Sequence, residues 1–169
     1  MQRHIEEMLV APVPSFIILA GYISGGVIRG LVVGTVVTFV ALFFTELHVD
    51  NFLIVFTVVL LTAILFSLGG FVNAVFAQKF DDISIIPTFV LTPLIYLGGV
   101  FYSIDLLPEF WQSVSMFNPI LYMVNTFRYG ILGVTDIDVT YAFIGVSLFI
   151  AVLFAVCLYL LEKGARLRS

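Results

Sequence analysis

Apolar residues occupy long runs of this chain, and polar residues gather in the short stretches between them. Four runs come close to, or exceed, the roughly 20 residues that a helix needs to cross about 30 Å of hydrocarbon. They cover residues 16–44, 51–76, 83–101 and 139–161, and Arg29 is the single formal charge inside them. The pattern predicts four transmembrane helices, of which the third is bent by Pro87 and Pro93.

Composition decides which solvent surrounds these helices. The chain of 169 residues is 62% hydrophobic and 11% charged, and its mean hydropathy is +1.19. A soluble domain of this size cannot hide so much apolar surface, because large apolar patches would remain exposed. We therefore expect one all-α integral membrane domain over residues 1–169, with membrane lipids as partners. The formal net charge of -4 gives no reason to expect a nucleic-acid partner.

Residues 1–14 have the pattern of a short amphipathic surface helix rather than of a secretory signal. The apolar positions follow the helical i, i+3, i+4 spacing, at Ile5, Met8 and Leu9. The charged positions lie one turn apart, at Arg3, Glu6 and Glu7, and Pro12 ends the segment. An ordinary solvated face that touches lipid headgroups would have the same pattern.

Basic residues predict the orientation in the membrane. If the N-terminus is cytoplasmic, four crossings return the C-terminus to the cytoplasm. Most basic residues outside the spans then lie inside, namely Arg3, Lys79, Lys163, Arg166 and Arg168, and only Arg128 lies outside. This distribution agrees with the positive-inside rule.

Residues 107–133 are too apolar for a soluble loop and too broken for one spanning helix. Pro108 and Glu109 suit the start of a short helix, and Asn118-Pro119 interrupts it before a second arm. A fifth complete crossing would place basic residues outside, so we expect an external re-entrant hairpin. An amphipathic hairpin lying flat at the outer interface, with its aromatic residues as a belt, is the alternative.

The first apolar run contains both a glycine strip and a charge. Gly26, Gly30 and Gly34 recur every four residues and form a smooth strip for close helix packing, within one subunit or between two. Arg29 is expected about one turn inside the hydrocarbon boundary. It should reach the cytoplasmic face or pair with Asp81, Asp82 or Glu162, and a role in substrate contact or gating is the functional alternative. For Arg128, the expected partners are Glu109, Asp105 or a lipid phosphate.

At this point the residues resemble a family. The run PLIYLGGVFYSIDLLPEFWQSVSMFNPILYMVNTFRYGILG is similar to the C-terminal signature of type-2 ABC transporter permeases, the bacterial membrane subunits of drug, polysaccharide and nodulation-factor exporters. The signature elements are Gly99-Val100-Phe101, Leu107-Pro108, Asn118-Pro119 and Arg128. The stretch Glu7-Met8-Leu9-Val10-Ala11-Pro12-Val13 resembles the family's cytoplasmic coupling element.

The resemblance implies an exporter permease in the bacterial inner membrane, with both termini cytoplasmic. Residues 1–14 would dock onto a separate ATP-binding subunit through Arg3, Glu6, Glu7, Leu9 and Pro12. The hairpin would form the outer gate around Pro108, Glu109, Asn118, Pro119 and Arg128. Permeases of this family have two further spans before the coupling element, so we expect the chain to correspond to the last two-thirds of such a protein, working as a homodimer or with a second permease.

No cofactor, metal site or catalytic residue is expected in the chain itself. The phosphate-binding pattern G-x-x-x-x-G-K-[ST] is missing from the sequence, so ATP would be used by the partner subunit. Two alternatives to the permease remain open: a channel or secondary carrier that uses the hairpin as a filter, and a membrane scaffold that does not transport.

Overall fold

The computed structural model describes residues 14–45, 49–77, 84, 87–101 and 103–166 of the chain. Within these ranges the protein is all-helical, as the apolar runs predict. Three helices are long and apolar enough to cross a membrane, namely α2 (Ser15–Ala41), α3 (Phe52–Phe76) and α8 (Val139–Arg166). Each starts within one residue of the predicted start, because apolar runs of this length satisfy their backbone polar groups as helices.

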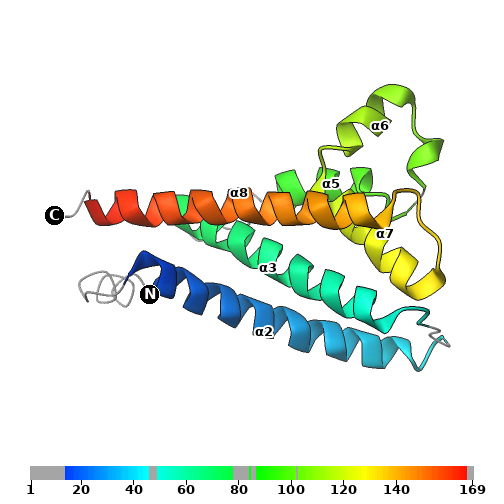
Figure 1. Ribbon diagram of the computed structural model, residues 1–169, viewed down its shortest axis with the longest axis horizontal. Coiled ribbons are helices and arrows are strands. Elements are labelled where there is room, and N and C mark those ends of the chain that lie inside the picture. Colours follow the sequence, from blue (N-terminus) through cyan, green and yellow to red (C-terminus); the bar gives the residue numbers. More distant parts are fainter. Residues whose placement is uncertain (1–13, 46–48, 78–83, 85–86, 102, 167–169) are drawn as a thin grey trace.

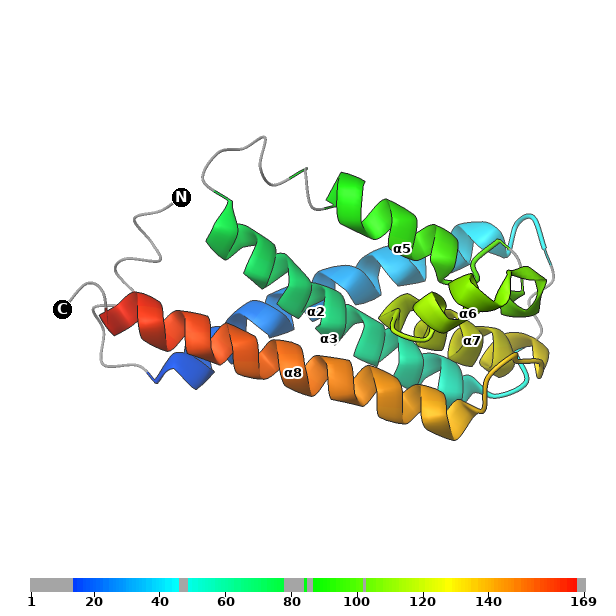
Figure 2. The ribbon, with the colours of Figure 1, turned by 90° about the horizontal axis from the view of Figure 1, so that it is seen from above.

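The three long helices lie side by side along the long axis of the molecule (Figure 1). α2 runs in one direction, while α3 and α8 both run in the other. The start of α2 and the end of α8 therefore lie at the same end of the bundle (Figures 1 and 2). We call this the terminal end, and we call the opposite end, where α3 and α8 begin, the hairpin end.

α3 is the central helix of the bundle and packs against both of the others. One core cluster joins Leu19 of α2, Leu68 of α3 and Cys157 of α8. A second cluster, nearer the hairpin end, includes Val58 of α3 and Val146 of α8. Outside these clusters most long apolar side chains on the three helices remain exposed to the surroundings.

Helix α5 (Thr92–Leu97) stands apart from the three long helices, as Figure 2 shows. It is preceded by η1, a π-helical turn over Pro87–Leu91, and the two form one apolar segment, Pro87–Leu97. Pro93 cannot donate to the carbonyl one turn earlier, which explains why the regular hydrogen-bond pattern shifts here. The described helix is thus shorter than the span expected over residues 83–101, and the π-helical turn begins at Pro87 and ends two residues before Pro93.

The region between α5 and α8 is built from short helices at the hairpin end. It contains η2, a 3-10 turn at Ile104–Leu106, then α6 (Glu109–Ser115) and α7 (Pro119–Leu132). α6 protrudes to the side of the bundle (Figure 1), whereas α7 packs against α3 and α8. The two helices separate at Asn118-Pro119, where the sequence predicts the break.

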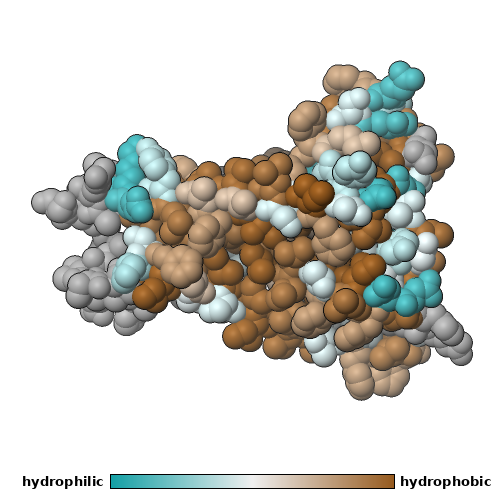
Figure 3. Space-filling view, in the orientation of Figure 1, coloured by the Kyte–Doolittle hydropathy of each residue, from teal (hydrophilic) through white to brown (hydrophobic). Residues whose placement is uncertain are grey.

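An apolar belt covers the middle of the molecule (Figure 3). Hydrophilic residues gather at its two ends, around the end of α8 and around α6 and the loop before α8. Within the belt α2 is the most exposed helix, since Leu19 is its only buried residue. Such a surface is stable only in contact with lipid or with further apolar helices.

Candidate functional site

Helix α7 is fixed at both ends by the residues that the sequence singled out. At its start, Asn118 Oδ1 accepts a hydrogen bond of 3.0 Å from the Ile120 amide, and Pro119 occupies the first turn, where no amide donor is needed. At its end Gly133 adopts φ 69, a left-handed conformation that favours glycine. The helix therefore continues beyond Gly130 and stops at Leu132.

Two side chains of α7 hold the end of the α5 segment. The Asn118 side-chain amide donates to the Leu94 carbonyl at 2.6 Å, and Arg128 Nη2 donates to the Gly99 carbonyl at 2.7 Å. Packing at Gly98 is also tight, because a Cβ added there would lie 2.6 Å from a methyl group of Ile120. The described part of the third apolar run is thus attached to the rest of the molecule mainly through α7.

Arg128 forms an ion pair with an acid that the sequence did not point to. Its Nη1 lies 3.2 Å from Asp136 Oδ2, and the two side chains are 22% and 18% exposed. Glu109, one of the expected partners, forms no ion pair with Arg128 in the described structure, and the side chain of Asp105 lies outside the described part. The turn at Gly133 folds the chain back, so an acid eight residues further on reaches the guanidinium group.

Asn125 is a site residue that sequence reasoning missed. It is fully buried, and its Oδ1 accepts from the Asp136 amide at 3.0 Å and from the Thr135 hydroxyl at 3.4 Å. It thereby holds the loop that carries the partner of Arg128. The sequence did contain a signal for it, because Asn125 is an amide in an otherwise apolar helical stretch. It also lies three residues before Arg128 and therefore on the same face of the helix.

The three glycines of the α2 strip have two different surroundings. A Cβ added at Gly26 would lie 2.8 Å from Ser67 Cβ, and one added at Gly30 would lie 3.3 Å from Ala63 Cβ. Both glycines therefore lie where α2 and α3 approach closely within one chain. Gly34 has nothing within 4 Å of an added Cβ and faces open space.

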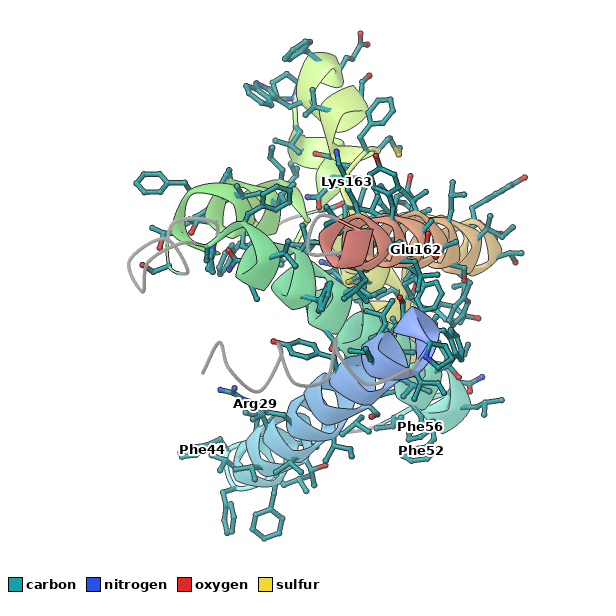
Figure 4. The ribbon with its side chains drawn as sticks, turned by 90° about the vertical axis from the view of Figure 1, so that its left-hand side faces the viewer. Arg29, Phe44, Phe52, Phe56, Glu162 and Lys163 are labelled. Atoms are coloured by element: carbon teal, nitrogen blue, oxygen red, sulfur yellow. The ribbon has the colours of Figure 1, made fainter. Side chains whose placement is uncertain are left out.

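Arg29 lies near the middle of α2. Figure 4 shows its side chain extending away from α8, which carries Glu162 and Lys163. No ion pair joins Arg29 to Glu162, and within the described residues no hydrogen bond to Arg29 is formed. Asp81 and Asp82 lie outside the described residues. An arginine at the centre of a spanning helix costs about 2.5–3.5 kcal/mol on insertion scales, so this position needs an explanation.

Both arginines line the same groove, which has a volume of about 890 Å³. Its walls come from α2, α3 and α7, with Val100 beside them. Apolar side chains dominate these walls, and the polar ones are Arg29, Thr62, Ser67 and Arg128. No carboxylate of the described residues lines the groove. A volume of this size is typical of small-molecule and cofactor sites.

Of the other predicted site residues, Gly26 and Gly30 line the groove, whereas Pro108, Glu109, Asn118 and Pro119 do not. Pro108 precedes α6, and Glu109 is its exposed first residue. The predicted coupling residues lie outside the described part of the chain, namely Arg3, Glu6, Glu7, Leu9 and Pro12. Among the residues that the structure describes, no three His, Cys, Asp or Glu side chains are grouped closely enough to hold a metal ion.

Comparisons with known proteins were made over the whole chain. Residues 1–132 match the family model described as ABC-2 type transporter. The chain is 54% identical over 168 residues to the Inner membrane transport permease YadH of Escherichia coli K12, a match that covers 99% of this chain and 66% of the relative. The chain thus spans just under two-thirds of that permease.

More distant relatives are named after nodulation. Nodulation protein J of Rhizobium leguminosarum bv. viciae is 26% identical over 132 residues, which cover 78% of this chain and 51% of that protein. The protein of the same name from Neorhizobium galegae is 24% identical over 158 residues, with coverages of 94% and 60%. No solved structure matches the chain significantly.

Proposed function

The chain belongs to the ABC-2 type transporter family, and on this premise we propose that it forms the membrane-spanning part of an ATP-driven exporter in the bacterial inner membrane. The observation that carries this proposal is the identity to the YadH permease along nearly the whole chain. The apolar belt with hydrophilic ends supports it, because such a surface suits a protein embedded in lipid. The proposed partner is a separate ATP-binding subunit, together with a second copy of this chain or a second permease.

The proposed contact with the ATP-binding subunit is the amphipathic segment 1–14. The double substitution Glu7→Lys with Leu9→Asp should prevent that subunit from co-purifying while membrane insertion continues. Glu109→Lys makes the same charge reversal at the hairpin end and should leave co-purification unchanged. If the double variant retains the subunit as the unchanged protein does, the assignment of the coupling segment is refuted.

We further propose four membrane crossings. α3 ends at the terminal end of the bundle, and α8 begins at the hairpin end (Figure 1). If both span the membrane, the chain between them must cross the apolar belt once more. The apolar segment Pro87–Leu97 runs toward the hairpin end on this route, which supports its assignment to the third of the four crossings (Figure 2).

In the proposed topology residues 107–133 form a hairpin at the outer surface. α7 supports this assignment, because its arm extends into the apolar belt. Near its end the Gly130 carbonyl accepts from the Asn51 amide at 2.9 Å, at the start of α3. Nearer its beginning Met123 packs with Val58 and Leu65 of the same helix. At 1.5 Å per residue, Val58 lies about 10 Å further into the belt than Asn51.

The tryptophan of this chain offers a test without substitutions. The sequence contains a single tryptophan, Trp111, which lies in α6 and is about half exposed. Lipids that are brominated at different depths of the acyl chain should quench its fluorescence differently. Strongest quenching by deep bromines would support a re-entrant α6, whereas strongest quenching near the headgroups would favour a hairpin lying flat at the interface.

Labelling from the outside tests the sidedness of the same region. A cysteine replacing Phe117, which is 82% exposed, should react with an impermeant thiol reagent added outside intact cells. A cysteine replacing Asn125, which is 0% exposed, should not react and serves as the matched control. Both variants carry Cys157→Ala. Reaction of the Phe117 variant only from the cytoplasmic side would reverse the proposed orientation.

A further inference from the structure

The groove between α2, α3 and α7 has a chemical character that packing alone does not require. Among the described residues that line it, the polar side chains are two guanidinium groups and two hydroxyls, and none is an acid. Ser67 Oγ already donates to the Ile23 carbonyl at 3.3 Å, whereas the guanidinium groups and the Thr62 hydroxyl can donate hydrogen bonds to an anion. The remaining walls are apolar, through residues such as Val33, Phe66 and Phe127.

The two arginines differ in their free hydrogen-bonding capacity. Arg128 already binds the Gly99 carbonyl and Asp136, although a guanidinium group has five donors and several remain. Arg29 has no polar partner among the described residues, and its side chain is exposed. A cation in this position within an apolar belt is stabilised most directly by an anion that enters the groove beside it.

The arginines also mark two depths of the groove. Gly30, next to Arg29, lies against Ala63 of α3, whereas Gly130, close to Arg128, is bonded to Asn51 before the start of that helix. Twelve residues of α3 at 1.5 Å each separate these levels by about 18 Å. The groove therefore extends from the middle of the belt to its hairpin end.

We propose that this groove binds an acidic amphiphile drawn from the surrounding bilayer. Its negatively charged headgroup would lie against Arg29, with Arg128 as a second contact toward the hairpin end, and its hydrocarbon chain would lie along the apolar walls. Charge complementarity and the apolar walls favour this occupant over a free anion, which would leave the walls uncovered, and over a lipid without an anionic group, which would leave Arg29 without a partner. If the proposed exporter function holds, the same site defines the chemical class of its cargo.

Binding can be measured without ATP or a partner subunit, so a negative result here leaves the exporter proposal standing. The purified protein in an uncharged detergent would be titrated with phosphatidylglycerol, and bound lipid would be counted by native mass spectrometry. Phosphatidylcholine with the same acyl chains tests the need for an acidic headgroup. Inorganic phosphate, added as a competitor, tests the need for the hydrocarbon chain.

We expect saturable binding of phosphatidylglycerol that is at least about tenfold tighter than binding of phosphatidylcholine and that phosphate does not displace. Arg29→Gln should weaken it by about tenfold. Lys163→Gln removes the same charge from an exposed position outside the groove and should leave binding unchanged. Val33→Trp keeps every charge but fills the groove, so it should also weaken binding.

Three results would overturn the proposal. Equal binding of the two lipids would show that a net negative charge on the lipid has no role. Displacement by inorganic phosphate would show a simple anion site. Unchanged phosphatidylglycerol affinity in both Arg29→Gln and Val33→Trp, with melting temperatures equal to that of the unchanged protein, would place the lipid elsewhere.

Discussion

The two arginines near the groove have opposite environments. Arg128 is held by a backbone carbonyl and a carboxylate, and the loop carrying that carboxylate is itself bonded to the buried Asn125. Arg29 has no such partner in the described structure and lies on the most exposed helix of the bundle. A charge that is bonded within the fold can stabilise it, whereas the position of a charge without such bonds is not explained by the fold. The contrast therefore separates a structural arginine from a candidate binding arginine.

The largest effect on stability is expected at Asn125. Asn125→Leu leaves the Asp136 amide without its acceptor and should lower the free energy of unfolding by about 1–3 kcal/mol for that donor alone. Thermal unfolding in detergent measures the loss. Thr126→Val is the matched control, since Thr126 is also buried but bonds only to the Tyr122 carbonyl in its own helix. Equal melting temperatures for the Leu variant and the unchanged protein would show that the hydrogen bonds of Asn125 do not stabilise the fold.

The comparison itself is tested by removing each arginine in turn. Arg128→Gln breaks the bonds to Gly99 and Asp136 and should cost about 1.5–3 kcal/mol, at the lower end because both side chains are partly exposed. Arg29→Gln should leave the melting temperature unchanged or raise it, because no bond within the described fold is lost. The same unfolding assay measures both. A large loss of stability on replacing Arg29 would mean that it, too, is structural.

A smaller difference in stability is expected between variants of two glycines in the α2 strip, Gly26 and Gly34. Gly26→Ala places a methyl group against Ser67 and should cost about 1 kcal/mol, since overpacking forces α2 away from α3. Gly34→Ala meets nothing within 4 Å and should stabilise the helix slightly. Melting temperatures of the two variants give the comparison. A loss of dimer on size-exclusion chromatography for Gly34→Ala alone would instead assign that glycine to a contact between subunits.

The smallest effect is expected on the pH dependence of stability. It concerns Asp138, which lies in the same loop as Asp136. The Asp138 carboxylate accepts from the Thr140 amide at 2.8 Å, and this bond, with further bonds from Thr140 and Tyr141, holds the pKa of Asp138 below its ordinary value of 3.8. Because the folded pKa is the lower one, the contribution to stability is present above pH 3.8 and disappears as pH falls through the folded value. Asp138→Asn keeps an amide cap and should show a smaller fall in melting temperature between about pH 6 and about pH 3 than the unchanged protein. An identical fall in melting temperature in both proteins would show that Asp138 does not contribute to the pH dependence of stability.

Several local features could be predicted from the sequence because neighbouring residues determine them. The starts of the three long helices follow from the length of the apolar runs. The break between α6 and α7 follows from Asn118-Pro119, since proline has no amide donor whatever surrounds it. The π-helical turn before α5 has the same cause at Pro93.

The partner of Arg128 could not be predicted in this way. Asp136 lies on the far side of the Gly133 turn, and its approach depends on the hydrogen bonds that Asn125 makes to the loop. The place of Arg29 along its helix also required the observed bounds of α2, which put it near the middle. Both facts concern how segments are placed in the fold rather than the segments themselves.

The sequence by itself determined that this protein is helical, that it belongs in a membrane and that its relatives are permeases, because hydrophobicity, proline positions and motif order are properties of the chain. Only the tertiary structure decided which polar groups meet. It brought Arg29 and Arg128 to one groove and, within the described residues, gave a carboxylate to only one of them. The physical reason is that ion pairs and grooves depend on distances of a few ångströms between helices, and these distances are set by packing around α3 rather than by spacing along the chain.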